Sequence, residues 1–124
     1  MVGAMDAIMF PRSVWRDVAL PAVVALAVLA GGVATLRAAR TVGVSQKNRM
    51  FQPGVLVLER GDLAEILNDD APLLHHAYVA TPEFSFDSGE QLPGNHTEVR
   101  FTVPGTFTVR CAIHPKMHLY VTVQ

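Results

Sequence analysis

Apolar residues are arranged in two different ways along the chain. Over residues 18–36 they form one uncharged stretch, VALPAVVALAVLAGGVATL, whereas after residue 44 they occur as short runs separated by turn-forming residues. A continuous stretch is typical of a membrane or export segment, while short alternating runs indicate β-strands. We therefore divide the chain into an N-terminal membrane anchor or signal segment with its linker, residues 1–44, and a folded domain, residues 45–124.

The short runs of the second part predict strands. Residues 99–103 alternate apolar and polar side chains, as a strand with one buried face does. The same pattern or a compact apolar run occurs at 55–58, 63–67, 76–80, 107–111 and 119–124, although 63–67 would also suit a short helical turn. Short strands at regular spacing predict an all-β sandwich or barrel, and we expect an antiparallel sandwich over about residues 50–124. An edge strand is either missing from this small domain or supplied by residues 44–52.

The apolar stretch has two interpretations. Its nineteen residues approach the roughly 20 that an α-helix needs to span a bilayer. Retained, it would be a transmembrane helix that anchors the domain. Because the small residues Gly32-Val33-Ala34 resemble a signal-peptide cleavage site, a cleaved signal peptide is the second interpretation.

Charges on either side of the stretch bear on its orientation. Two cations precede it, Arg12 and Arg16, and four follow it closely, namely Arg37, Arg40, Lys47 and Arg49. The positive-inside rule would place the C-terminal domain in the cytoplasm. The metal site considered below favours the exterior or the periplasm instead, and we give it more weight because the charge difference is small.

Net charge and cysteine content exclude several classes of protein. The formal net charge is −1, so no basic surface for nucleic acid is indicated. The single cysteine, Cys111, excludes an intramolecular disulfide, a four-cysteine zinc site and a two-cysteine dinuclear copper site. In an exported protein a lone cysteine is either an idle thiol or a metal ligand.

The most specific motif is CAIHPKM, which places Cys111, His114 and Met117 in one short loop between two predicted strands. Thiolate, imidazole and thioether are the soft and borderline ligands that suit copper. Taken singly, each residue is more often a core or surface side chain. Together with a second histidine, either His75 or His76, they form the trigonal set with a weak axial methionine that is typical of blue-copper sites.

These residues resemble the cupredoxin family, and most closely its amicyanin and plastocyanin-like members, which have the same short loop with proline after the histidine. The likeness extends over about residues 50–124. Upstream it includes Phe51, Pro53, Val55, Val57, Gly61, Asn68-Asp69-Asp70 and His75, and before the loop it includes Gly94, Phe101, Pro104-Gly105 and Phe107. The resemblance implies a Greek-key β-sandwich and carries over His75, Cys111, His114 and Met117 as ligands of one copper ion.

Where many relatives have asparagine after the first histidine, this chain has His76. That residue would either tie the two ligand loops together through a ring nitrogen or compete with His75 for the metal. Two further histidines, His96 and His118, are expected to be solvated, as are the carboxylates of Asp69-Asp70 in a predicted turn.

The resemblance implies a type 1 copper electron carrier rather than an enzyme, and no hydrolytic or acid–base constellation is visible in the sequence. Its copper ion would alternate between Cu(I) and Cu(II), and redox protein partners would dock near His114 on a patch formed by Leu73, Leu74, Ile113 and Pro115. We expect the domain on the extracytoplasmic side, held by residues 18–36. The alternative is a copper-delivery or copper-holding protein, or a cupredoxin-like subunit of a membrane oxidoreductase complex.

Overall fold

The computed structural model describes residues 36–124, which form strands and loops without a helix. The predicted membrane segment therefore lies outside the described residues, except for Leu36, which is fully exposed. Within the described part, no helix is long and apolar enough to cross a membrane. The first strand begins at Thr41, before residue 45, where we placed the start of the domain.

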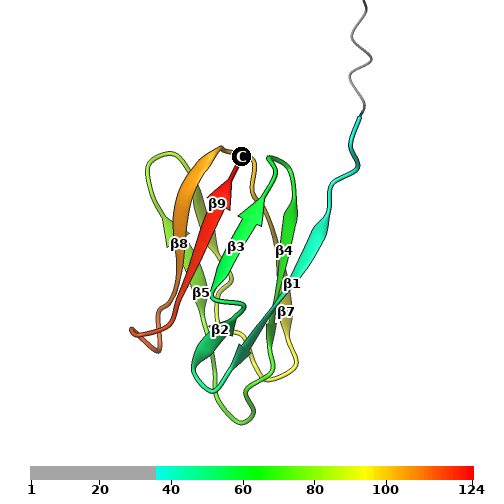
Figure 1. The fold of residues 1–124 in the computed structure, drawn as a ribbon. Helices are drawn as coiled ribbons and strands as arrows, with labels where there is room; N and C mark the ends of the chain where they lie inside the picture. Colours follow the sequence, from blue (N-terminus) through cyan, green and yellow to red (C-terminus); the bar gives the residue numbers. More distant parts are fainter. Residues whose placement is uncertain (1–35) are drawn as a thin grey trace, which may run out of the picture. The chain divides into compact units, whose positions relative to one another are not determined.

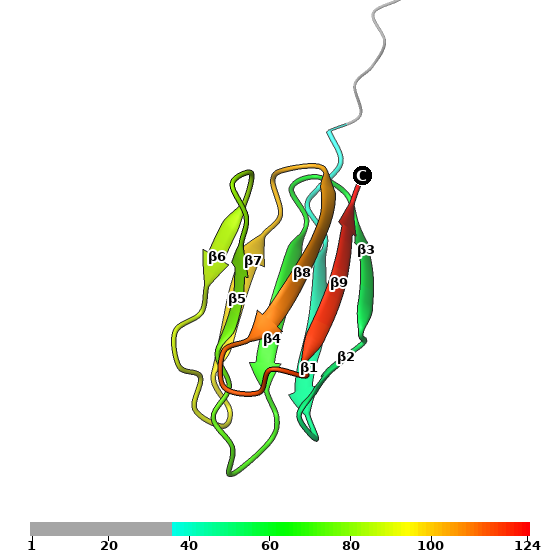
Figure 2. The same cartoon turned by 90° about the vertical axis from the view of Figure 1, so that its left-hand side faces the viewer.

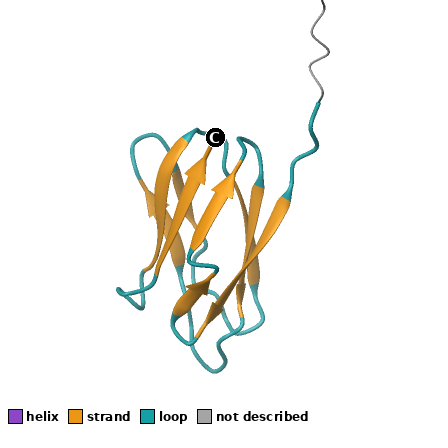
Figure 3. Ribbon diagram, viewed as in Figure 1, coloured by secondary structure: helices purple, strands orange, loops and turns teal. Residues whose placement is uncertain are grey.

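The described residues contain nine strands, which form two sheets. They are β1 (Thr41–Lys47), β2 (Met50–Gln52), β3 (Val55–Leu58), β4 (Leu63–Asn68), β5 (Ala77–Ala80), β6 (Ser85–Asp87), β7 (His96–Arg100), β8 (Gly105–Cys111) and β9 (His118–Val123). The order in the first sheet is β2-β1-β4-β7, and in the second it is β3-β9-β8-β5-β6. Figures 1 and 2 show the two sheets packed face to face, and Figure 3 shows the connections as loops. The predicted all-β sandwich is confirmed, and β2 forms one edge of the first sheet.

Both sheets are mixed, which corrects the prediction that the sandwich is antiparallel. β1 runs parallel to β4, and β3 runs parallel to β9. Parallel neighbours need a crossover connection. Here the chain passes through the other sheet between the two strands of each pair, so that it returns in its original direction. Short apolar runs do not encode the direction of their neighbours, and the sequence pattern could not supply it.

One predicted strand ends earlier than expected, one predicted strand is confirmed over its helical alternative, and one strand was not predicted. The strand predicted at 99–103 is β7, which ends at Arg100. Phe101 is nevertheless fully buried and stacks on Phe84 with ring centroids 5.0 Å apart, so the apolar alternation continues past the end of the strand. Residues 63–67 belong to a strand and not to a helical turn. β6 was missed, because three residues are too few to show a period.

The core lies between the sheets and supports the loops at one end. Its fully buried apolar side chains include Phe101, Leu58, Ile66, Met117, Leu119, Val44, Val109 and Val121. Burying a side chain of this size stabilises a fold by about 1.5–3 kcal/mol. Met117 belongs to this core and to the predicted copper loop, so the loop is fixed by packing as well as by its hydrogen bonds.

The two ends of the sandwich carry different parts of the chain. We call one end the entry end, because residues 36–40 lead into β1 there; Gln124 lies at the same end. The Arg60 N–H donates to the Gln124 carbonyl over 2.9 Å, and the Leu63 N–H donates to the Arg40 carbonyl over 2.8 Å. At the site end lie the turn between β1 and β2, the β4–β5 connection and the β8–β9 loop (Figure 1).

Candidate metal centre

Three donor atoms converge at the site end. Cys111 Sγ lies 3.7 Å from His75 Nδ1 and 3.7 Å from His114 Nδ1, and the two imidazole nitrogens are 3.2 Å apart. Metal bonds of about 2.0–2.3 Å place the ligands of one ion roughly 3–4 Å from each other. The geometry therefore matches three ligands arranged around one shared ion, and among the described residues it is the only such cluster of three.

The position of Cys111 follows from its strand. It is the last residue of β8, where it pairs with Ala77 of β5. The chain then turns sharply, with the Met117 N–H donating to the His114 carbonyl over 3.0 Å. Proline fixes its own φ, so Pro115 restricts the loop directly after the histidine. This turn brings His114 back over the strand end from which Cys111 projects.

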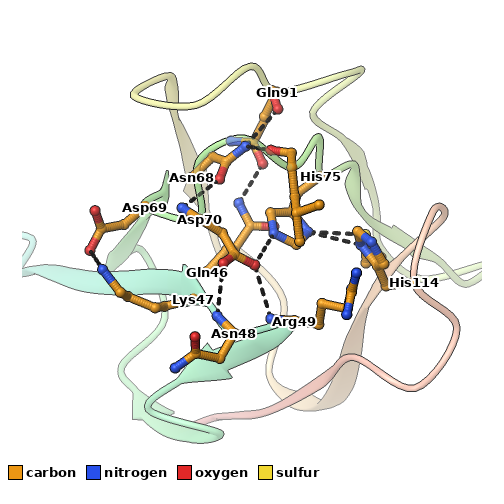
Figure 4. A network of polar contacts seen from close by, with 12 residues as sticks. Gln46, Lys47, Asn48, Arg49, Asn68, Asp69, Asp70, His75, Gln91 and His114 are labelled. Carbon is orange, nitrogen blue, oxygen red and sulfur yellow. Dashed lines mark hydrogen bonds and ion pairs between the residues drawn. The ribbon is translucent and has the colours of Figure 1, made fainter.

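His75 is held from the opposite side by a buried carboxylate. The side chain of His75 is fully buried, and its Nε2 lies 3.0 Å from Asp70 Oδ2. Because an ionised carboxylate only accepts hydrogen bonds, His75 Nε2 is the donor in this contact, while Nδ1 faces the cluster. The Asp70 carboxylate also accepts the backbone N–H groups of Asn48 and Arg49, over 3.0 and 2.9 Å. Figure 4 shows this network.

Asp70 is a site residue that the sequence did not reveal, and the prediction that its carboxylate is solvated is wrong. Only 9% of its surface is exposed. Burial by itself raises the pKa of a carboxyl, but the hydrogen bonds from Arg49, His75 and Asn48 outweigh this effect and hold the pKa of Asp70 below its ordinary value of 3.8. Its neighbour Asp69 is exposed, as predicted, and pairs with Lys47 Nζ at 3.5 Å. An aspartate five residues before a candidate ligand was the available signal, but the sequence did not show which of two adjacent aspartates turns inward.

His76 contributes to the site through its backbone and not through its ring. The ring Nε2 lies 2.6 Å from Asp87 Oδ1, away from the cluster. The His76 N–H donates to Cys111 Sγ over 3.4 Å, and its carbonyl accepts the Ala112 N–H over 2.9 Å. The structure thus places His75 in the cluster and ties the two loops by main-chain bonds at His76, whereas a tie through the His76 ring was one of the two alternatives raised by the sequence.

His114 is the least buried of the three donors. Burial lowers the pKa of His114, and the positive charges that His75 and Arg49 can carry lower it further. Figure 4 shows the Arg49 side chain extended toward His114. A lowered pKa favours neutral imidazole, which is the form that binds metals.

The remaining predicted residues lie at different depths. Met117, the fourth predicted ligand, is 1% exposed and directly follows the turn that carries His114. His96 is exposed on β7, and His118 lies 3.1 Å from an Arg110 guanidinium nitrogen through its Nε2. Neither belongs to the three-residue cluster.

The chain matches no protein-family model and no curated protein. Among solved structures it is similar to the Cu-containing nitrite reductase (NirK) from Thermus scotoductus SA-01, at 28% identity over 68% of this chain and 22% of that chain, with a TM-score of 0.63. A reduced amicyanin matches at 19% identity over 71% of this chain and 86% of that one, with a TM-score of 0.63. A purple cupredoxin from Nitrosopumilus maritimus matches at 20% identity over 67% and 99%, with a TM-score of 0.59. The chain thus spans about a fifth of the nitrite reductase and nearly all of the purple cupredoxin.

Proposed function

We propose that the described residues form a cupredoxin domain and that the chain is a type 1 copper protein that carries single electrons. One observation carries the proposal, namely the convergence of His75 Nδ1, Cys111 Sγ and His114 Nδ1 within 3.2–3.7 Å of each other. Two imidazoles and one thiolate fit copper, and Met117 in the same loop is the candidate for the weak axial ligand.

Bound copper would supply a one-electron couple between Cu(I) and Cu(II). The residues around it contribute rigidity. Asp70 fixes the ring of His75, the His76 N–H is directed at Cys111, and both sheets support the two loops. Ligands that move little between oxidation states allow fast electron transfer, and a hydrogen bond to the thiolate stabilises its negative charge.

Electrons are proposed to enter and leave through His114, which is partly exposed. Its neighbours Ile113 and Pro115 are exposed, and Leu73 and Leu74 are half-buried on the preceding loop. An apolar surface over a redox centre excludes water when a partner docks. These residues are the proposed docking surface for redox proteins.

We propose a carrier rather than an enzyme. The similarity to a nitrite reductase covers 22% of that chain, and its activity belongs to the whole of that protein. In residues 36–124, the one cluster of three metal-binding side chains is assigned here to copper.

The extracytoplasmic location is also a proposal, supported by the lone-thiolate copper site and by the apolar residues 18–36. Reporter enzymes fused to the C terminus test this location, and activity of a cytoplasm-only reporter would overturn it.

A redox titration of the copper-loaded full chain tests the proposed function. We expect one electron per chain to be taken up and released over repeated cycles without loss of copper. The Cys111→Ser variant is the control and should lack the couple. Release of copper on each reduction would overturn the proposal in favour of a copper-delivery role.

A further inference from the structure

A shallow hollow lies beside His114 at the site end. It measures about 410 Å³ and is lined by Arg49, Ile113, His114, Pro115, Lys116 and Met117. The six side chains come from two segments, the β1–β2 turn and the β8–β9 loop. Its lining combines the apolar side chains of Ile113, Pro115 and Met117 with one cation from each segment.

No carboxylate lines this hollow, although acidic residues outnumber basic ones in the domain. Residues 36–124 contain eight Lys and Arg against nine Asp and Glu, a formal charge of 8 − 9 = −1. The nearest acidic residue of the network, Asp70, is buried and accepts hydrogen bonds from His75, Asn48 and Arg49. The positive rim of the hollow is thus a local feature and does not reflect a generally basic protein.

Arg49 is held in place by its own backbone. Its φ of 55° lies in the left-handed region, which residues other than glycine seldom adopt. The Arg49 N–H donates to Asp70 Oδ2 over 2.9 Å, so the carboxylate that orients His75 also fixes the turn from which Arg49 extends. Figure 4 shows the guanidinium reaching toward His114. The cation is therefore positioned by the same network as the metal ligand.

We propose that this hollow docks an acidic redox protein, whose apolar contact area is rimmed by carboxylates that pair with Arg49 and Lys116. The proposal rests on the electron-transfer function above and specifies the partner's chemistry. Ile113 and Pro115 would lose water at the centre, and the two cations would attract the partner and fix its orientation. One electron then passes between the partner and the copper centre through His114, and no bond is made or broken.

Small redox ions of opposite charge test this proposal on the copper-loaded full chain in a nonionic detergent. Hexacyanoferrate(III) and tris(phenanthroline)cobalt(III) each remove one electron from the reduced protein. The double variant Arg49→Gln with Lys116→Gln lacks both cations of the hollow. Its rate of oxidation by the anion should fall about 10-fold relative to its rate of oxidation by the cation, which is the low end of the range for electrostatic steering. The ratio of the two rates is the readout, because a change in reduction potential affects both.

The matched control is Arg60→Gln with Arg100→Gln, which removes two exposed arginines at the entry end. This control changes the net charge by the same amount, but at the opposite end of the sandwich from His114. Salt screens charges beyond the Debye length, which is roughly 8 Å at physiological ionic strength. Its rate ratio should equal that of the unaltered chain. Equal ratios in all three proteins, or an effect of the control as large as that of the double variant, would overturn the proposal.

A second experiment reads docking without electron transfer. The redox-inert anion hexacyanocobaltate(III) is titrated into the metal-free full chain, and amide shifts are followed by NMR. We expect saturable shifts at residues 49 and 113–117, reduced at least several-fold in the Arg49→Gln and Lys116→Gln double variant. Shifts confined to the entry end, or none, would overturn the docking proposal. A failed redox titration with these shifts intact would count against the electron-carrier function alone.

Discussion

Asp70 Oδ2 accepts a hydrogen bond from His75 Nε2 over 3.0 Å, and both side chains are buried. The same carboxylate holds the β1–β2 turn through two backbone N–H groups. One acidic side chain therefore orients a candidate copper ligand and fixes the turn that carries Arg49. Carboxylates behind metal-binding histidines set the tautomer of the ring and raise its basicity.

The Asp70→Asn variant should bind copper more weakly, by roughly 10- to 100-fold, as is typical when the partner of a ligand is removed. It should also raise the reduction potential, because a neutral amide stabilises Cu(II) less than a carboxylate does. Copper competition and potentiometry measure the two effects. Asp69→Asn is the control, since its exposed carboxylate contacts Lys47 only, and an equal effect of both variants would contradict the role of Asp70.

Replacing the two adjacent histidines should have unequal results. His75→Ala removes a buried donor and should abolish the blue site. His76→Ala keeps the backbone N–H that donates to Cys111 and loses only the ring contact with Asp87, so it should stay blue with nearly unchanged copper affinity. Visible absorption during copper titration makes the comparison. Loss of the site in His76→Ala with retention in His75→Ala would reverse the assignment of the first histidine.

Met117 should tune the site without being required for it. Met117→Leu preserves the volume of a side chain that is 1% exposed, so the fold should persist. Without the weak thioether donor Cu(II) is disfavoured more than Cu(I), and the reduction potential should rise while the colour remains. Voltammetry of the variant beside the unaltered chain measures the shift, and an unchanged potential would argue against axial ligation.

Asp62 should make stability depend on pH at the entry end. It accepts the backbone N–H of Arg40, which is the largest influence, and that of Glu59, together with an Arg37 guanidinium. These contacts lower the pKa of Asp62 from 3.8 to about 2. The folded state thus retains the ionised form better than the unfolded chain does. The ionised Asp62 carboxylate therefore adds to the free energy of unfolding above the ordinary pKa of 3.8. This contribution is lost as the pH falls through the pKa of the folded state, about 2.

Urea unfolding of Asp62→Asn and the unaltered chain tests this linkage. The variant should be less stable near neutral pH, and the difference should shrink as the pH approaches about 2, where Asp62 becomes protonated. Asp69→Asn serves as an exposed control. A deficit in Asp62→Asn that is independent of pH would assign its effect to packing and not to charge.

Much of the fold and of the candidate site could be predicted because local signals coincided with long-range packing. Apolar alternation located β8 and β9, a compact apolar run located β3, and the spacing of Cys111, His114 and Met117 located the loop. Strand direction could not be predicted, because β1 and β4 become parallel only through a crossover between the sheets. Asp70 was missed for a similar reason, since its partners Asn48 and His75 are brought together only by folding.

The visible absorption spectrum of the copper-loaded full chain tests the central claim most directly. A type 1 site should give an intense blue band from charge transfer between the Cys111 thiolate and Cu(II). The band should bleach on reduction, return on reoxidation and be absent in Cys111→Ser. A pale Cu(II) spectrum, or a blue band that survives in Cys111→Ser, would contradict the copper site described for His75, Cys111 and His114.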